Sequence, residues 1–326
     1  MAWRLRLAPE KTNFNFFAYQ WVTFGGSMAL MLAAFVLWGT MGLNYGIDFK
    51  GGTTMRTESG TEIDTGLYRS TLEALNVGDV AITEVFDPSF RADQHVATIR
   101  ISAEEGDAAV TADMMDEITA ALTTMDPELK VTSTETVGPK VSGELVTSSI
   151  IAVTITSLAI MAYLWLRFEW QFALGGVLAL LHDVFITIGI FALFQIKFDL
   201  TIVAALLTIL GYSINDTVVV FDRLRENLIK YKTMPLRDVM NLSVNETLSR
   251  TLMTSVTTLI AVGAMLWLGG DVIRGFSLAI FIGVMLGTYS SVYVAKNLVL
   301  FLGLDRSDKP RKTGKGADHE FANVDA

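Results

Sequence analysis

The chain contains no cysteine among its 326 residues, which excludes a disulfide framework, a cysteine-ligated zinc site and a thiol nucleophile. It has three histidines, His95, His182 and His319, and they are too scattered to build a histidine-rich metal centre. Charged residues make up only 18% of the chain, whereas 51% are hydrophobic. A soluble core this apolar would lack the polar surface needed to cover it. The sequence therefore predicts a membrane protein, and no cofactor is expected.

Six apolar runs are each long enough to cross the hydrocarbon core as a helix, which takes about 20 residues. Gly283 and Gly287 have the spacing that permits close packing of helices in a membrane. The first run follows several basic residues and has the alternative interpretation of a signal peptide. It is too long for one, and it lacks a small-residue cleavage site. The predicted spans are 21–43, 145–166, 172–194, 200–221, 251–268 and 273–302.

The distribution of basic residues predicts how these spans are oriented. Most of the 25 basic residues fall on one side, whereas the short loops of the other side contain only Lys197 and Arg274. Loops rich in lysine and arginine stay in the cytoplasm, so both termini are expected there. The segment 303–326 is polar and has no apolar periodicity, which predicts a disordered cytoplasmic tail.

The segment 44–144 is too polar to enter the membrane and long enough to fold outside it. Its acidic residues far outnumber its basic ones and account for the negative net charge of the chain. This excess argues against nucleic acid or anionic lipid as a partner, and the alternative interpretation is that it only keeps the domain soluble. Alternating strands and helical stretches occur in the order β-α-β-β-α-β, which predicts a ferredoxin-like α+β domain. Strands are expected at 53–58, 80–86, 95–101 and 129–137, with helices at 63–75 and 108–124.

Several polar residues lie inside the predicted spans, where an ionisable side chain costs about 2.5–3.5 kcal/mol at the centre. Such residues need a partner or a function. They are His182 and Asp183 in the third span, Asn215 and Asp216 in the fourth, Arg250 at the start of the fifth, and Lys296 in the sixth. Lys296 lies close enough to the end of its span to reach the interface by snorkelling.

Asp216 and Arg250 occur at similar depth on consecutive spans, so we expect them to approach one another. A carboxyl beside an arginine keeps its charge, whereas the same carboxyl in an apolar site holds a proton. Helix movement would then load and release a proton, driven by about 2.3 kcal/mol per 100 mV of membrane potential. The alternative is a static ion pair that holds the bundle together. For His182 and Asp183 the alternative is a hydrogen-bonded packing pair.

Glycines flank the segment 44–144 at both ends. Gly51 and Gly52 can absorb large backbone changes, so a domain attached there can swing. The alternative is a tight turn into the first strand. Gly138-Pro139, together with Gly143, forms a second, weaker hinge candidate. If both tethers bend, a rearrangement of the bundle becomes a movement outside the membrane.

Several motifs of the chain resemble those of the SecD/SecF family of membrane proteins. They follow one another in the family's order, and the resemblance covers nearly the whole sequence. The matching stretches are GIDFKGGT at 46–53, VGPKVS at 137–142, LHDV at 181–184, GYSINDTVVVFDRLREN at 211–227 and NETLSRT at 245–251.

The resemblance implies a polytopic α-helical membrane protein with six transmembrane helices, equivalent to half of an RND-type bundle. It places one periplasmic ferredoxin-like domain between the first and second helices. The implied divisions are a cytoplasmic segment 1–20, the first helix 21–43, the periplasmic domain 44–144, five further helices 145–302 and the tail 303–326. In this family Asp216 and Arg250 fall on positions used in proton conduction, and Gly51 and Gly52 fall on a flexible junction.

The implied function is that of an accessory, non-enzymatic subunit of the bacterial Sec export machinery in the inner membrane. Such a subunit pairs with SecD and uses the proton-motive force to promote late steps of translocation. The implied partners are SecD, the SecYEG channel, YajC and the exported unfolded polypeptide, which meets the periplasmic domain. The one external domain is shorter than expected of SecD itself, which points to the partner subunit.

Two other functions stay open. An RND-like, proton-coupled transporter of a small molecule or lipid would need a larger external region than one domain of about 100 residues. A structural scaffold of the translocase would conduct no protons. Replacing Asp216 by Asn discriminates, because it preserves the side chain's shape and removes the proton site.

Overall fold

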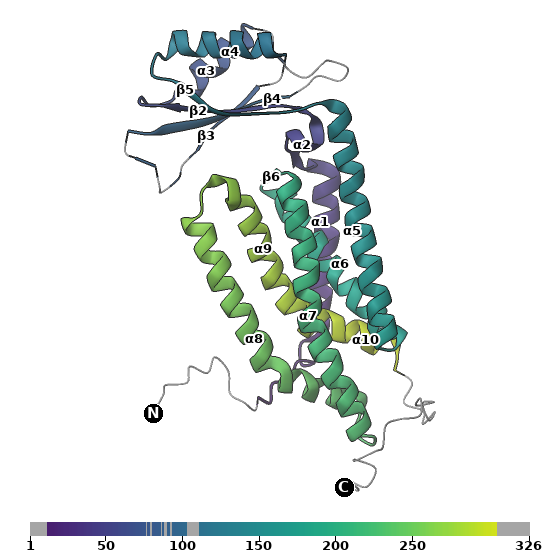
Figure 1. Ribbon diagram of the computed structural model, residues 1–326. Coiled ribbons are helices and arrows are strands. Elements are labelled where there is room, and N and C mark those ends of the chain that lie inside the picture. The colour runs from purple at the N-terminus through teal and green to yellow at the C-terminus, as the bar shows by residue number, and fades with distance from the viewer. Residues whose placement is uncertain are drawn as a thin grey trace, which may run out of the picture.

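The computed structural model describes residues 12–75, 77–78, 80–85, 87, 90–91, 93–102 and 111–304. A bundle of long helices carries a small sheet domain at one end (Figure 1). Within the described residues, six helical segments are long and apolar enough to cross a membrane, as predicted. They are α1 (Gln20–Met41), α5 (Pro139–Arg167), α6 (Trp170–Leu193), α7 (Leu200–Lys230), α8 (Leu236–Leu268) and a last span built from α9 (Asp271–Ser290), the π-helical turn η1 (Ser291–Ala295) and α10 (Lys296–Leu302).

Three of these helices extend well beyond the predicted spans. α8 begins at Leu236 rather than near residue 251, and α7 continues to Lys230 rather than ending near residue 221. α5 begins at Pro139, directly after the sheet domain. Hydropathy detects only the part of a helix that suits the hydrocarbon core. The polar turns beyond that part are still helical because their backbone hydrogen bonds continue.

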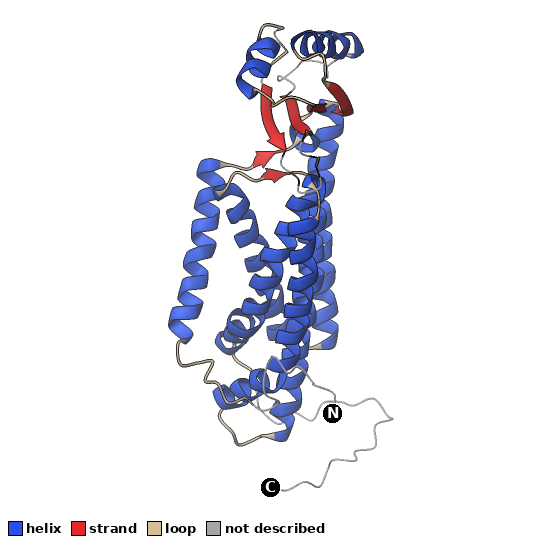
Figure 2. Cartoon of the chain, turned by 90° about the vertical axis from the view of Figure 1, so that its left-hand side faces the viewer, coloured by secondary structure: helices blue, strands red, loops and turns tan. Residues whose placement is uncertain are grey.

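The sheet domain has the predicted order of strands and helices. Its antiparallel sheet has the strand order β3-β4-β2-β5, and α3 and α4 cover the face turned away from the bundle (Figures 1 and 2). The elements are β2 (Gly52–Ser59), α3 (Thr65–Glu73), β3 (Val80–Val85), β4 (His95–Ser102), α4 (Ala112–Met125) and β5 (Lys130–Val137). Residue 86 of the predicted second strand and residues 108–110 of the predicted second helix lie outside the described residues.

Local chemistry explains where the two helices of this domain start. The Asp64 carboxylate accepts hydrogen bonds from the backbone N–H groups of Gly66 and Leu67, which caps α3. Thr111 caps α4 in the same way. The core between helices and sheet is apolar and fully buried, so the domain has its own hydrophobic centre. Its largest fully buried side chains are Met55, Leu72, Ile99, Ile101, Ile118 and Leu122.

Three short elements were absent from the sequence prediction. They are β1 (Asn44–Tyr45), α2 (Ile47–Lys50) and β6 (Lys197–Phe198). β1 and β6 pair in parallel across a gap of about 150 residues in the chain. Two-residue strands carry no readable periodicity, so only the tertiary structure reveals them.

α7 lies within the bundle and packs against α6, α8 and α9. The predicted close approach at Gly283 and Gly287 is confirmed. A Cβ added at Gly287 would lie 3.0 Å from Cβ of Ser213, and one added at Gly283 would lie 2.9 Å from Cγ2 of Ile209. These two glycines of α9 therefore bring its backbone directly against α7.

A helix contact against backbone joins α1 to α6 at Gly189. A Cβ added there would lie 2.6 Å from Cα of Ala34, which is backbone and has no side chain to rotate away. We expect Gly189→Ala to destabilise the protein by about 1–3 kcal/mol through overpacking. Thermal unfolding of the protein in detergent measures this. Gly26→Ala, whose added Cβ would meet nothing within 4 Å, is the matched control, and equal melting of both variants would contradict the prediction.

The prediction that Lys296 snorkels to the interface is wrong. Its side chain is completely buried, and Nζ donates a hydrogen bond of 2.9 Å to the carbonyl oxygen of Phe16. Nζ also lies 3.7 Å from the ring centroid of Phe17. A carbonyl and an aromatic face thus replace water around the ammonium group. Sequence alone gave no sign that a segment preceding α1 covers this position.

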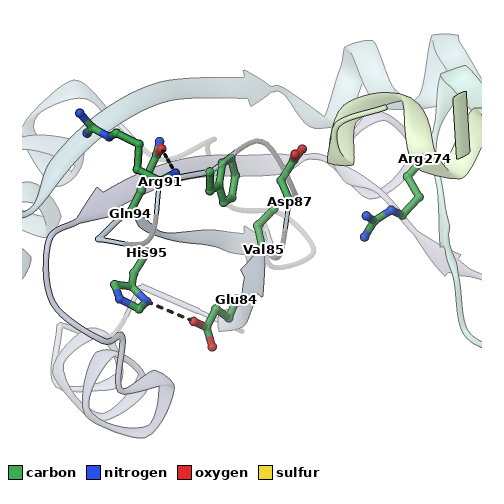
Figure 3. Close-up of a pocket in the computed structure, with 8 residues that line it drawn as sticks. Glu84, Val85, Asp87, Arg91, Gln94, His95 and Arg274 are labelled. Atoms are coloured by element: carbon green, nitrogen blue, oxygen red, sulfur yellow. Dashed lines mark hydrogen bonds and ion pairs between the residues drawn. The ribbon is translucent and has the colours of Figure 1, made fainter. Parts of the chain in front are cut away.

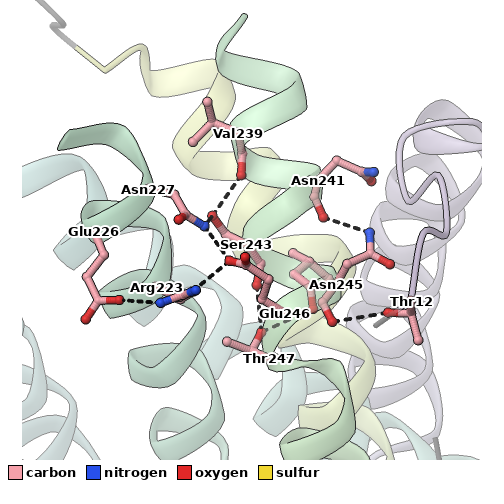
Figure 4. Close-up of polar contacts among 11 residues, drawn as sticks. Thr12, Arg223, Glu226, Asn227, Val239, Asn241, Ser243, Asn245, Glu246 and Thr247 are labelled. Atoms are coloured by element: carbon pink, nitrogen blue, oxygen red, sulfur yellow. Dashed lines mark hydrogen bonds and ion pairs between the residues drawn. The ribbon is translucent and has the colours of Figure 1, made fainter. Parts of the chain in front are cut away.

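That covering segment, residues 12–19, crosses the end of the bundle opposite the sheet. The Asn245 amide of α8 both donates to the carbonyl of Phe14 and accepts from its N–H, at 2.9 and 2.8 Å. Asn241, one turn earlier, accepts from the N–H of Phe16 at 2.9 Å. Figure 4 shows Thr12 of this segment reaching the same turn of α8. The segment therefore links α8 to α10 through Phe16 and Lys296.

Candidate functional site

The Asp216 carboxyl is buried in the middle of α7, with 2% of the residue exposed. Its Oδ1 lies 3.4 Å from the Thr254 hydroxyl of α8, and its Oδ2 has no hydrogen-bond partner among the described residues. Thr254 also donates to the carbonyl oxygen of Arg250, one turn away. A buried carboxyl oxygen without a partner is costly when charged, so this group is suited to carrying a proton.

The structure brings Arg250 near Asp216 without joining them. Within the described part of the chain, no ion pair of 4.0 Å or less links the two side chains. Thr254 occupies the contact that the sequence assigned to Arg250, and sequence reasoning missed it because hydroxyls are common in this helix.

Asn215 and Asp216 are neighbours in sequence but point to different sides of α7. Asn215 is exposed, whereas Asp216 faces α8. Asn215 belongs to a row of exposed positions that contains no large apolar side chain: Thr201, Ala204, Thr208, Gly211 and Asn215. Their spacing of three or four residues puts them on one helix face. Small and polar residues suit contact with another helix better than contact with lipid.

A second polar centre surrounds Asp183, which is fully buried on α6. Its Oδ2 accepts hydrogen bonds from Ser213 of α7 at 2.8 Å and Ser290 of α9 at 2.7 Å. Its Oδ1 lies 3.0 Å from Nδ1 of His182, which is also buried. One carboxylate thereby connects three helices. The arrangement agrees with the packing interpretation of His182 and Asp183.

The two centres share a helix. Ser213, which contacts Asp183, lies one turn before Asp216 on α7. This spacing was readable in the sequence, whereas the contribution of Ser290 was not, because it depends on how α9 packs. His182 Nε2 is buried and has no hydrogen-bond partner within the described chain. The bundle therefore holds two buried acidic groups about one helical turn apart in depth.

A network of charged and amide side chains braces α7 against α8 at the end opposite the sheet (Figure 4). Arg223 donates to Glu246 at 2.7 Å and to Glu226 at 2.8 Å. Asn227 donates to Ser243 at 3.0 Å and to Glu246 at 2.7 Å. This brace fixes the register of α7 and α8, and with it the depth of Asp216 relative to Arg250.

The two glycines at the junction of α2 and β2 occupy backbone conformations that other residues rarely adopt. Gly51 has φ +76° and Gly52 has φ +126°. A Cβ added at Gly51 would lie 3.4 Å from Cα of Pro139, and Gly52 pairs with Val137. The two predicted tethers of the domain therefore lie side by side.

The domain touches the bundle again at the far end of its sheet. Asp87 lies against Gly270, where an added Cβ would be 2.8 Å from the carboxylate. Between the two bodies is a pocket of about 470 Å³, shown in Figure 3. His95 and Glu84 lie next to one another in its lining, with Nδ1 3.8 Å from Oε1. The lining residues are Glu84, Val85, Asp87, Phe90, Arg91, Gln94, His95 and Arg274. Among the described residues, no cluster of histidine and acidic side chains is suited to a metal ion.

Comparison with known families identifies two matching regions. Residues 117–305 match the model described as "Protein export membrane protein SecD/SecF, C-terminal", and residues 36–62 match "SecD/SecF GG Motif". The second region contains Gly51 and Gly52. The first contains Asp183, Asp216 and Arg250.

Three similar proteins carry the same name. "Protein translocase subunit SecF" of Cereibacter sphaeroides is 64% identical over the whole length of both chains. The protein of that name from Rhodobacter capsulatus is 64% identical over 99% of this chain and 98% of its own. The one from Rickettsia akari is 38% identical over 89% of this chain and 92% of its own.

Two solved structures share the fold. SecDF from Thermus thermophilus, described as a translocon-associated membrane protein, superposes with a TM-score of 0.81 and 34% identity over 91% of this chain. SecDF in a super-membrane-facing form superposes with a TM-score of 0.66 and 35% identity over 92%. This chain spans only 39% of the length of either one.

Proposed function

The chain belongs to the SecD/SecF family of protein-export membrane proteins, and from this premise we propose how it works as an accessory subunit of the Sec translocase. It is a multi-pass membrane protein that pairs with SecD and couples the proton-motive force to late steps of export. The supporting observation is the Asp216 carboxyl, buried between α7 and α8 with one oxygen unpaired in the described chain.

The proton step follows from the geometry of that carboxyl. When Asp216 is protonated, the neutral group is tolerated beside Thr254, and Arg250 stays apart from it. When the proton leaves, the carboxylate attracts Arg250, which pulls α8 toward α7. Each proton that crosses releases about 2.3 kcal/mol per 100 mV. That energy drives the exchange between the two helix arrangements.

The movement is passed on through the joint at Gly51 and Gly52. Because the second tether at Pro139 lies against Gly51, the domain turns about one point. We assign residues 44–144 to a periplasmic ferredoxin-like domain that grips the exported unfolded polypeptide. The remaining assignments are the cytoplasmic segment 1–20, the first transmembrane helix 21–43, the rest of the bundle 145–302 and the cytoplasmic tail 303–326.

The exposed face of α7 gives SecD its docking place in this proposal. Asn215 and Arg250 are exposed in this single chain at membrane depth, where contact with lipid would be costly. A partner bundle packed there shields both and encloses the surroundings of Asp216. We further assign SecYEG and YajC as partners in the inner membrane, with both termini in the cytoplasm. Nucleic acid is not among the proposed partners.

Depletion of the protein tests this function against its rivals. We expect unprocessed precursors of exported proteins to accumulate, and the tagged chain to copurify with a SecD-like partner. A small-molecule transporter predicts drug sensitivity with normal export instead. A scaffold predicts precursor accumulation that the Asp216→Asn variant relieves. Normal export after depletion, with an unrelated set of copurifying proteins, would reject the proposal.

A further inference from the structure

The segment 44–50 lies against residues 194–199, the corner that joins α6 to α7. More than 140 residues separate these two segments in the sequence. β1 pairs with β6, so Asn44 lies opposite Lys197 and Tyr45 opposite Phe198. Beyond this pair, the N–H of Gly46 donates to the carbonyl of Phe198 at 2.8 Å. The Asn44 amide donates to the carbonyl of Gln195 at 2.9 Å. We refer to residues 44–50 in this arrangement as the corner clamp.

The corner clamp also caps α7. Oδ2 of Asp48 accepts a hydrogen bond of 3.0 Å from the N–H of Leu200, the first residue of that helix. The helix has its own cap as well, because Asp199 accepts from the N–H groups of Thr201 and Ile202. The first N–H groups of a helix have no partner inside it, and acidic side chains satisfy them well. Asp199 stabilises α7 locally, whereas Asp48 attaches another segment to it.

Apolar and polar contacts around the clamp make it one body with the corner. The Phe198 ring contacts those of Tyr45, Phe49 and Phe191, with centroids 6.2, 5.8 and 6.3 Å away. Aromatic pairs in this range contribute stability beyond their burial. On the other side, Arg100 of β4 donates to the Asn44 side chain at 3.3 Å. Burial lowers the pKa of the Arg100 guanidinium, and the nearby Asp199 opposes this shift.

We propose that Asp48 is a positioning residue that fixes the corner clamp to α7, so that both move together and the chain bends only at Gly51 and Gly52. Asp216 lies about 24 Å along α7 from this cap, at 1.5 Å per residue. A tilt or shift of α7 at the proton site therefore displaces residues 44–50 directly. This inference rests on the proposed function, because it names the element that carries movement from Asp216 to the sheet domain.

Cysteine crosslinks test whether the clamp stays closed, and the cysteine-free sequence gives them a clean background. Adjacent strands lie about 4.8 Å apart, within the Cα separation that a disulfide accepts. In the variant Asn44→Cys/Lys197→Cys, we expect the rate of proton-driven export after oxidation to stay within about twofold of the rate before it. A tenfold loss of rate would correspond to about 1.4 kcal/mol in the activation free energy. The comparison crosslink is Asp87→Cys/Gly270→Cys, which joins the sheet domain to the bundle at its second contact. We expect its oxidation to stop proton-driven export and reduction to restore it.

Substitutions at Asp48 test the cap itself. Export in membrane vesicles is measured with and without an imposed proton gradient, and the ratio is the readout. Asp48→Ala should bring this ratio close to one, while Asp48→Asn should restore it because the cap needs an acceptor oxygen and no charge. Asp199→Ala is the control, since it removes a cap of α7 and keeps the attachment. It should lower the melting temperature and leave the ratio unchanged.

The outcomes of these experiments distinguish a failure of this inference from a failure of the proposed function. If oxidised Asn44→Cys/Lys197→Cys stops export as Asp216→Asn does, the clamp opens during the cycle and the inference is wrong. An unchanged ratio in Asp48→Ala overturns it as well, and so does a ratio near one in a well-folded Asp48→Asn. If Asp216→Asn itself exports normally, the proton-driven function fails, whatever the clamp does.

Discussion

Asp216→Asn is expected to remove the proton-driven part of export while the protein still folds and binds its partner. Asparagine has the shape of aspartic acid and can accept from Thr254, but it neither binds nor releases a proton at this position. The membrane potential supplies about 2.3 kcal/mol per proton and 100 mV, which corresponds to at most a roughly 50-fold acceleration. We expect most of this gain to disappear.

The measurement is export into inverted membrane vesicles with and without a proton gradient. Copurification of the SecD-like partner and the melting temperature show whether the variant is intact. Asp222→Asn is the matched control, because that carboxylate pairs with Arg167 at a half-exposed position and should matter little. Export by Asp216→Asn that still responds fully to the gradient would rule out the conduction role and leave a scaffold.

Asp183→Ala is expected to cause the largest loss of stability among substitutions in the bundle. It removes the acceptor shared by Ser213 and Ser290 and the partner of His182, all of which stay buried. Each buried polar group left unpaired costs about 1–3 kcal/mol, so the loss of the partner of three such groups predicts a destabilisation of at least about 3 kcal/mol. The contacts between α6, α7 and α9 should loosen together.

Thermal unfolding in detergent, followed by circular dichroism, measures this loss. Asp183→Asn keeps one acceptor oxygen, and the serine hydroxyls can turn to accept from its amide. It should therefore fall between the wild-type protein and Asp183→Ala. If Asp183→Ala instead melts like the wild type, the carboxylate does not hold the three helices together, and a role in proton transfer becomes the better interpretation.

The sequence located the acidic and basic groups of the bundle correctly but not their contacts. Asp216 and Arg250 were paired by depth. In the structure the Thr254 hydroxyl contacts the Asp216 carboxyl instead, and it also donates to the backbone carbonyl of Arg250. The depth of a residue in the membrane follows from counting residues along its helix. The neighbour that its side chain contacts depends on how each helix is oriented about its own axis in the packed bundle. Asn215 shows the same limit, since it adjoins Asp216 in sequence and faces away from it.

Lys296 and Asp48 show what long-range contacts add. A lysine near the end of a span normally reaches water, but residues 12–19 fold back over Lys296 and enclose it. Asp48 belongs to a glycine-rich motif that the sequence analysis interpreted as a hinge. Only the fold shows that it caps a helix beginning at Leu200. Neither contact leaves a local pattern, because each joins segments that are far apart in the chain.

The sequence by itself determined the six spans and the order of strands and helices in the external domain. These follow from hydrophobicity and from periods of two and 3.6 residues, which act over short stretches of chain. The tertiary structure alone decided that the two glycine tethers lie side by side, that the Asp183 carboxylate on α6 accepts hydrogen bonds from α7 and α9, and that the corner clamp meets α7. These features depend on residues brought together by packing, and packing is a property of the whole bundle.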